Sequence, residues 1–121
     1  MNRRKTGFEN LHVYLLAEQI GDLVWDIVHK WERFAKDTVG KQLINSADSI
    51  AANIAEGTGR GSFADNKRFA KIARGSLFEV KHWLKRAQSR GLLNKNEDER
   101  LRSLVDELIP RLSAYINSIG K

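Results

Sequence analysis

A set of cations along residues 62–91 has the residue types and the spacing that suit the binding of phosphate groups. Projected at roughly 100° per residue, its members fall within about 80° of one another, opposite the apolar residues of the same stretch. They are Lys67, Lys71, Arg74, Lys81 and Lys85. Phe78 projects into the middle of this set, where its ring can stack on a base while the cations neutralise phosphates. The pattern predicts contact with nucleic acid; the alternative is a solvated helix face with Phe78 at a contact between subunits.

The net charge of the chain is concentrated in the same stretch. The 121 residues carry a formal net charge of +6. Residues 62–91 contain eight basic and two acidic side chains, whereas basic and acidic residues balance in the remainder. Arg3-Arg4-Lys5 makes residues 1–9 a basic N-terminal arm, for which a merely solvated terminus is the alternative. The excess charge therefore belongs to one segment, which favours an anionic partner.

Residues suited to catalysis or metal binding are scarce. The chain has no Cys, which excludes a disulfide framework, a thiolate zinc site and a cysteine nucleophile. Its three His residues are scattered, and acidic pairs such as Asp22 and Asp26 are typical of solvated helix faces. Gly57, Gly59 and Gly61 follow a predicted helix rather than a strand, so they indicate a turn and not a dinucleotide-binding loop. We therefore expect no catalytic residue, no metal site and no cofactor, and hence a protein that is not an enzyme.

Four segments repeat apolar residues at intervals of three and four, which is the period of an amphipathic helix. We expect helices at about 10–34, 38–56, 63–90 and from 94 or 96 to 119. Their apolar faces include Ile20 and Ile27, Leu43 and Ile54, Val80 and Leu84, and Leu108 and Leu112. No segment shows the period of two that strands require. The pattern predicts an all-α fold, an antiparallel up-down-up-down four-helix bundle that forms a single domain over residues 1–121.

Residues typical of helix ends accompany these segments. The expected N-caps are Asn10 for the first helix, Asp37 or Thr38 for the second, Ser62 for the third, and Asn94 or Asn96 for the fourth. Pro110 lies inside the fourth helix. Because proline has no backbone N–H, it predicts a kink or a local break there.

The sequence contains no segment suited to a membrane. No apolar run approaches the roughly 18–20 residues that cross a bilayer. The basic start of the chain is not followed by the apolar core of a signal peptide. We therefore expect a cytoplasmic protein without membrane contacts.

Two blocks of sequence resemble the signature of a known bacterial family. They are residues 49–62, SIAANIAEGTGRGS, and residues 69–80, FAKIARGSLFEV. In this order they resemble the conserved blocks of the proteins encoded in bacterial 23S rRNA intervening sequences. Phe8-Glu9-Asn10-Leu11 resembles the start of the first helix in that family. Ala51 and Ala52 stand where relatives often have Pro and Ser, which predicts a more regular helix here.

The resemblance implies a small bundle that assembles into a homo-oligomer, in known relatives a pentameric ring, with no established catalytic activity. A structurally similar branch comprises the accessory variability proteins of diversity-generating retroelements. These proteins are basic and bind a reverse transcriptase and its RNA template. The expected partners are therefore further copies of the chain, RNA or DNA, and a reverse transcriptase.

Polar and glycine residues of the first block are expected to stabilise the junction between the second and third helices. They are Ser49, Asn53, Glu56, Gly57 and Arg60. Asn53 can satisfy backbone groups of the loop, and Glu56 can pair with Arg60 or Arg74. The alternative places Arg60 on a phosphate, because it lies on a glycine-rich turn before a helix N-terminus whose N–H groups suit an anion.

These observations predict a non-enzymatic oligomeric bundle that binds nucleic acid, with RNA expected, through a basic third helix. The resemblance suggests that the protein is an accessory subunit of a retroelement reverse transcriptase. The residues expected at the nucleic acid are Arg60, Lys67, Lys71, Arg74, Phe78, Lys81 and Lys85. The alternative is a protein-interaction scaffold of the same family, in which the basic face binds an acidic protein and no nucleic acid.

Overall fold

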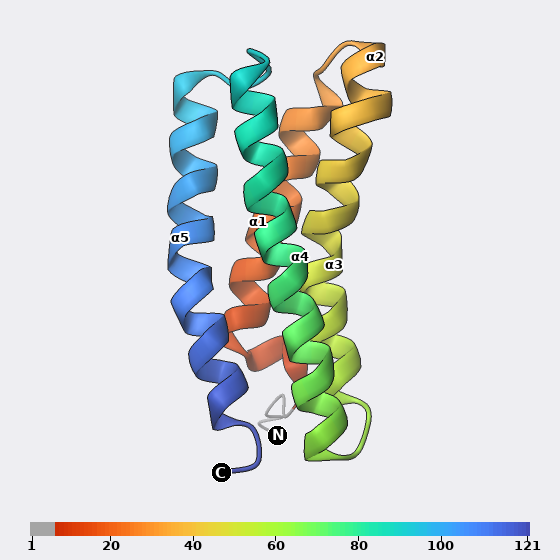
Figure 1. The fold of residues 1–121 in the computed structure, drawn as a ribbon, viewed down its shortest axis with the longest axis vertical. Coiled ribbons are helices and arrows are strands. Elements are labelled where there is room, and N and C mark those ends of the chain that lie inside the picture. The colour runs from red at the N-terminus through yellow and green to blue at the C-terminus, as the bar shows by residue number, and fades with distance from the viewer. Residues whose placement is uncertain (1–6) are drawn as a thin grey trace, which may run out of the picture.

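The computed structural model describes residues 7–121, which are helical with no strand among them (Figure 1). Four long helices are α1 (His12–His29), α3 (Lys41–Thr58), α4 (Phe63–Ser89) and α5 (Lys95–Ser118). A 3₁₀ turn, η1 (Phe8–Asn10), precedes α1, while α2 (Arg33–Ala35) and a π-helical turn, η2 (Lys36–Gly40), lead into α3. The predicted all-α class is confirmed. Residues 1–6 of the predicted N-terminal arm lie outside the described residues.

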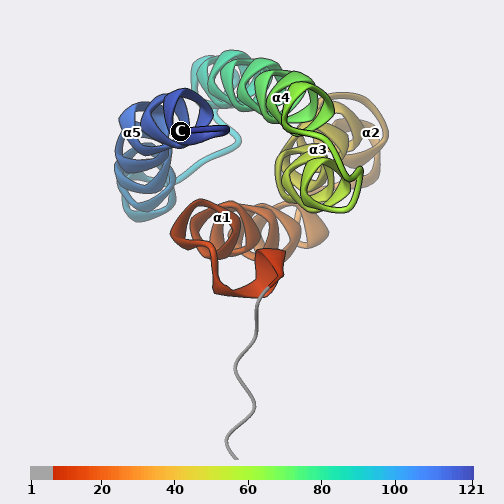
Figure 2. The same ribbon diagram turned by 90° about the horizontal axis from the view of Figure 1, so that it is seen from below.

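The long helices surround an apolar core. In Figure 2, α3 lies between α1 and α4, and α5 contacts the same two helices from the other side. The largest fully buried side chains come from all four helices and include Ile20, Ile27, Leu43, Ile50, Ile54, Leu77, Leu101, Leu108 and Leu112. Burial of each such side chain contributes about 1.5–3 kcal/mol to stability. The residues predicted on the apolar faces are therefore the ones that the core buries.

α1 is shorter at both ends than the helix predicted at 10–34. Leu11 occupies its N-cap position without a side-chain bond, and the Leu11 N–H donates to the Phe8 carbonyl at 2.9 Å, closing η1. The prediction that Asn10 caps this helix is therefore wrong. α1 ends at His29, and Trp31 lies beyond it but still packs against the core, which explains why the apolar period extends past the end of the helix.

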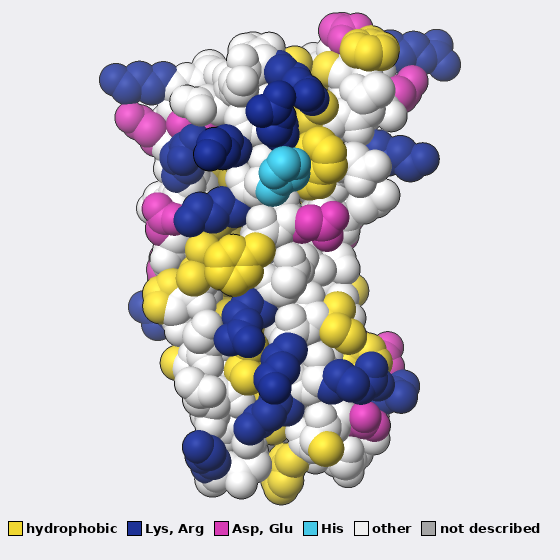
Figure 3. Space-filling view, in the orientation of Figure 1, with side chains coloured by type: hydrophobic (Ala, Val, Ile, Leu, Met, Phe, Trp, Pro, Cys, Tyr) yellow, Lys and Arg dark blue, Asp and Glu magenta, His cyan; other side chains and the backbone are white. Residues whose placement is uncertain are grey.

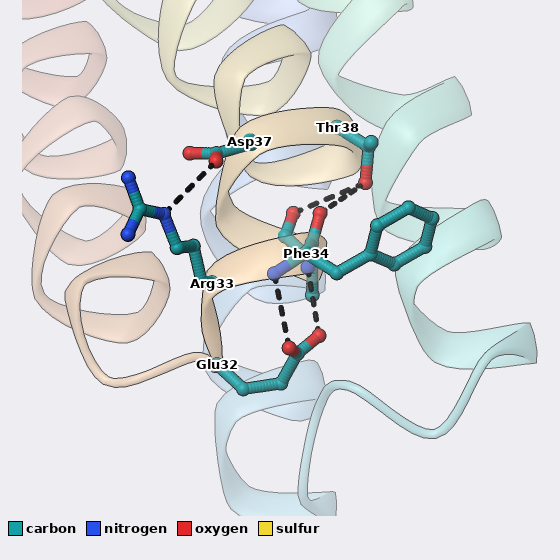
Figure 4. A network of polar contacts seen from close by, with 6 residues as sticks. Glu32, Arg33, Phe34, Asp37 and Thr38 are labelled. Atoms are coloured by element: carbon teal, nitrogen blue, oxygen red, sulfur yellow. Dashed lines mark hydrogen bonds and ion pairs between the residues drawn. The ribbon is translucent and has the colours of Figure 1, made fainter.

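A glutamate begins the next helical segment, which runs through α2, η2 and α3. Glu32 has an extended backbone, and its carboxylate accepts bonds from the N–H groups of Phe34 at 2.9 Å and Ala35 at 2.8 Å (Figure 4). Thr38 lies inside this segment and donates its hydroxyl to the Phe34 carbonyl at 2.7 Å. Asp37 pairs with Arg33 at 3.7 Å. The predicted caps, Asp37 and Thr38, are therefore wrong.

The predicted caps of the last two helices are correct. Ser62 accepts a bond from the N–H of Asp65 at 3.1 Å, and Asn94 forms a reciprocal capping box with Glu97. Of the two alternatives predicted at Pro110, a kink or a local break, the break is wrong, because α5 continues through Pro110 to Ser118. Pro110 is exposed, so the bundle tolerates the lost backbone hydrogen bond at the surface of the helix.

Two properties of the described residues bear on the class of the protein. Within residues 7–121, no helix combines the length and the apolar character needed to cross a membrane. Over the same residues, no group of three His, Cys, Asp or Glu side chains is arranged to hold a metal ion.

Candidate nucleic-acid interface

The cations predicted to bind nucleic acid lie along one side of α4. We call them, together with Phe78, the basic face: Lys67, Lys71, Arg74, Phe78, Lys81 and Lys85. Three of the lysines are exposed, whereas Lys67 and Arg74 are half-buried. Figure 3 shows Lys and Arg side chains above and below a hydrophobic patch on the side of the molecule to which α4 contributes. The opposite side of α4 is fixed in the core by Ala73, Val80 and Leu84. The helix therefore presents the basic face on a rigid support.

The cations of the basic face have no acidic partner in the described part of the chain. No carboxylate of residues 7–121 lies within 4.0 Å of any of them. Arg74 Nη1 is 3.4 Å from the Ser113 hydroxyl on α5, a neutral partner. On α5, in contrast, Arg102 pairs with Asp98 at 2.9 Å. Because uncompensated cations raise the local potential, the basic face attracts anions more strongly than the paired cations of α5.

Phe78 adds an aromatic ring to this charged surface. Its side chain is 50% exposed, because it lies on the side of α4 opposite the buried residues. His82, on the same helix, is exposed, and its ring meets the Trp83 ring edge-on at 4.8 Å. Ile72, also on α4, is 42% exposed. A ring among cations suits base stacking, and the exposed apolar area equally suits a contact with protein.

Arg60 was expected either at the helix junction or on a phosphate, and its contacts place it at the junction. Its guanidinium pairs with Glu56 at 3.2 Å at the end of α3 and with Asp65 at 3.8 Å at the start of α4. It also lies over the Phe69 ring, 5.0 Å from the centroid, while Arg68 lies 4.5 Å from the same centroid. Two carboxylates thus compensate Arg60, which sets it apart from the basic face.

Comparison with known proteins gives the family. Residues 9–114 match the sequence model of the family described as 23S rRNA-intervening sequence protein. The chain belongs to this family. Among solved structures it is similar to a protein of unknown function from the S23 ribosomal protein family of Bacteroides thetaiotaomicron VPI-5482. The two share 21% sequence identity and a TM-score of 0.77, over 88% of this chain and 99% of the other, which shows a common fold. No curated protein matches the chain.

In this member of the 23S rRNA-intervening sequence family, Ser49 bonds to Asn53 within α3 and to Ser76 of α4. The Asn53 amide donates to the Ser49 carbonyl at 2.8 Å and to the Ser49 hydroxyl at 3.0 Å. The Ser76 hydroxyl of α4 donates to the same Ser49 oxygen at 3.2 Å. The prediction that Asn53 serves the loop backbone is therefore wrong. The bond to Ser76 could not be predicted from the sequence, because spacing along one helix does not identify a partner on another.

Gly57, part of the first block, leaves room for the close approach of α4. It is buried, and a Cβ there would come within 2.7 Å of Asn66 Oδ1 and 3.0 Å of the Asn66 backbone oxygen. The same Cβ would be 3.1 Å from the Phe69 Cβ. The first block of the signature thus forms a close α3–α4 junction, and the second block supplies the opposite side of it.

Proposed function

We propose that this chain is a non-enzymatic protein that binds nucleic acid, RNA above all, through the basic face of α4. The observation that carries the proposal is a set of five cations on one rigid helix, none paired with a carboxylate of the described residues. The stretch that contains α4 also holds the whole excess charge of the chain. Arg60 is left out of the proposed contact, because Glu56 and Asp65 already pair with it.

The proposed contact has two physical parts. Cations that meet phosphates release the counterions condensed on the nucleic acid, so binding weakens as salt rises and depends little on sequence. Phe78, half-exposed among these cations, offers a surface on which an unpaired base can stack. The second part favours single-stranded RNA, because its bases are accessible to an aromatic side chain.

The test measures the affinity of unrelated RNA and DNA oligonucleotides by fluorescence anisotropy at several salt concentrations. Each Lys→Ala change in the basic face should reduce the slope of log affinity against log salt by about 0.7–0.9. Phe78→Ala should lower affinity by about 1–3 kcal/mol and leave the slope unchanged. The double reversal Lys71→Glu/Lys85→Glu should abolish most of the binding.

A matched control separates a local contact from net charge. Lys95→Glu/Arg100→Glu changes the net charge by the same amount at exposed positions of α5. It should retain most of the affinity that the reversal in the basic face removes. Equal losses in the two variants, or intact binding in Lys71→Glu/Lys85→Glu, would exclude the basic face as the binding surface.

The finer architecture is part of the proposal. The short connections between α3 and α4 and between α4 and α5, with the order of colours along the helices in Figure 1, support an antiparallel up-down-up-down bundle. The family resemblance supports assembly into a homo-oligomer, most simply a pentamer. Light scattering should then give about five times the 13.8 kDa of one chain, and a strict monomer at micromolar concentration would exclude the ring. A nucleic-acid partner of this kind fits a cytoplasmic protein.

A protein-interaction scaffold is the second candidate, and the exposed Phe78 and Ile72 on α4 favour it. In this case the basic face binds an acidic protein, for which the reverse transcriptase of a diversity-generating retroelement is one proposed partner. Loss of one protein partner from Lys71→Glu/Lys85→Glu, without any affinity for nucleic acid in the parent chain, would establish this function. A reverse-transcriptase gene beside the coding sequence would support the retroelement role.

A further inference from the structure

A groove opens between α1 and the start of α3, away from α4. Its volume is about 450 Å³, and the buried Val28 of α1 and the half-buried Ile44 of α3 supply its apolar base. Trp25 of α1 also lines the groove and is 58% exposed. None of the described residues that line the groove belongs to α4, and Figure 2 places α1 and α4 on opposite sides of the bundle. The groove is therefore separate from the basic face.

The π-helical turn η2 gives the groove its charged rim. A Cβ on Gly40 would lie 2.7 Å from Val28 Cγ1, so only a glycine lets η2 come this close to α1. Lys36, the first residue of η2, and Lys41, the first residue of α3, both line the groove. Turns of this kind within helices are frequent at functional sites, because they redirect side chains that a regular helix would place elsewhere.

Lys36 and Lys41 form no ion pair within the described residues. No carboxylate of residues 7–121 lies within 4.0 Å of the Lys36 or Lys41 ammonium group. Asp37, the acidic residue that lines the groove, pairs instead with Arg33 at 3.7 Å. This end of the groove is therefore complementary to an anionic group.

Two acidic residues, Asp22 and Asp48, follow on the side of Trp25 away from Lys36 and Lys41. Asp22 precedes Trp25 by about one turn of α1, and Asp48 follows Ile44 by about one turn of α3. An occupant with many negative charges would be repelled by these two residues. The groove is thus apolar in its middle and positive at one end only, which restricts what it can bind.

We infer that this groove binds a segment of a partner protein that carries one bulky apolar side chain with a carboxylate about one helical turn from it. The apolar side chain packs against Trp25, Val28 and Ile44, and the carboxylate meets Lys36 and Lys41. Exposed tryptophan rimmed by polar residues is typical of protein interfaces, where it often supplies much of the binding energy. The inference does not depend on nucleic-acid binding, since no residue of the basic face lines the groove.

The test is a selection from a random 12-residue displayed peptide library against the full chain, with removal of peptides that also bind Trp25→Ala. Enriched peptides should share a large apolar residue with Asp or Glu within four positions. A synthetic, fluorescein-labelled member of this set then gives the dissociation constant by anisotropy. Trp25→Ala and Lys41→Glu should each weaken it about tenfold or more. Circular dichroism should be unchanged, because both side chains are exposed.

Controls make the result specific to the groove. Leu15→Ala, which removes an exposed apolar side chain elsewhere on α1, and Lys81→Glu, in the basic face, should leave peptide affinity unchanged. A peptide with Lys in place of its Asp or Glu should bind Lys41→Glu more tightly than it binds the parent chain. Nucleic-acid affinity should be unchanged in Trp25→Ala, so that failure of one proposal is distinguishable from failure of the other.

Three outcomes would overturn the inference. One is a selection without peptides that depend on Trp25, and another is enrichment of apolar peptides that lack a carboxylate. The third is a Trp25→Ala variant that loses its oligomeric state, since the groove would then be a contact between copies of this chain.

Discussion

The carboxylate of Asp48 on α3 lies over Gly21 of α1. A Cβ on residue 21 would come within 3.0 Å of Asp48 Oδ1, so the buried glycine leaves the space beside this oxygen. Burial raises the pKa of Asp48 above its ordinary value, and the nearby charge of Asp22 raises it further. The contact between α1 and α3 therefore includes a carboxylate whose charged form is destabilised by its surroundings in the folded protein.

Substitution of this carboxylate by the neutral amide in Asp48→Asn should stabilise the protein at pH 7. Because the folded-state pKa is raised, folding is favoured most below the ordinary aspartate pKa of about 4, and stability falls as the pH rises through the folded pKa. Thermal unfolding between pH 3 and pH 8 should give Asp48→Asn a higher Tm at pH 7 and little advantage below about pH 4. Asp26→Asn, at an exposed position of α1, is the control. A difference in Tm between Asp48→Asn and the parent chain that does not vary with pH would contradict this account.

Gly57→Ala should destabilise the junction of α3 and α4. The new methyl group would lie 3.0 Å from the Asn66 backbone oxygen, which cannot move without a shift of α4. Overpacking of this kind costs about 1–3 kcal/mol, measurable by urea unfolding. Gly59→Ala is the matched control, because the nearest atom to its new Cβ is 3.6 Å away. Similar stabilities for the two variants would show that the close approach at Gly57 is not required.

Glu32→Ala should weaken the start of the α2–η2–α3 segment. The Glu32 carboxylate accepts two backbone N–H bonds, and loss of an N-cap costs about 1 kcal/mol. Glu32→Gln retains an acceptor oxygen and should recover part of this loss. Asp106→Ala removes an exposed carboxylate from α5 and should have little effect on urea unfolding. If Glu32→Ala were as stable as Asp106→Ala, the cap would contribute nothing.

Gly75→Ala should stabilise α4. Gly75 is exposed inside this helix, and nothing lies within 4 Å of the position that its Cβ would take. Alanine in place of a helical glycine gains about 0.5–1 kcal/mol by reducing the freedom of the unfolded chain. Thermal unfolding should show the gain. Nucleic-acid affinity should not change, since the substitution leaves every cation of the basic face in place; a lower Tm would show hidden strain in α4.

The helices and their core follow from the sequence because burial depends on local spacing. Ile20, Leu43, Val80 and Leu108 recur with the period of a helix, and each is buried. The start of the second helical segment could not be found in this way. Its cap is Glu32, a residue type that caps less often than Asp37 or Thr38, and only the fold shows which one begins the helix.

The candidate site likewise has one part that the sequence predicts and one part that depends on the packing of helices. The basic face could be predicted, because its members share one helix and project to one side of it. The partners of Arg60 and Ser49 depend on how α4 packs against α3, and no spacing within one segment fixes that geometry. Arg60 consequently had two interpretations in the sequence; in the structure its guanidinium pairs with Glu56, as the junction interpretation predicts, and also with Asp65.

Ser49 and Ser76 should be energetically coupled across the α3–α4 contact. The Ser76 hydroxyl is largely buried and donates to Ser49 Oγ at 3.2 Å. Ser49→Ala and Ser76→Ala should each cost about 1 kcal/mol, the usual net contribution of one neutral hydrogen bond. Either change removes the shared bond, so the double variant should cost about 0.5–1 kcal/mol less than the two single costs combined. Ser46 is the control, because its hydroxyl donates within α3 to the Gln42 carbonyl at 2.8 Å. In urea unfolding, Ser46→Ala and Ser76→Ala should be additive; additivity for Ser49 and Ser76 as well would show that their hydroxyls do not stabilise the contact.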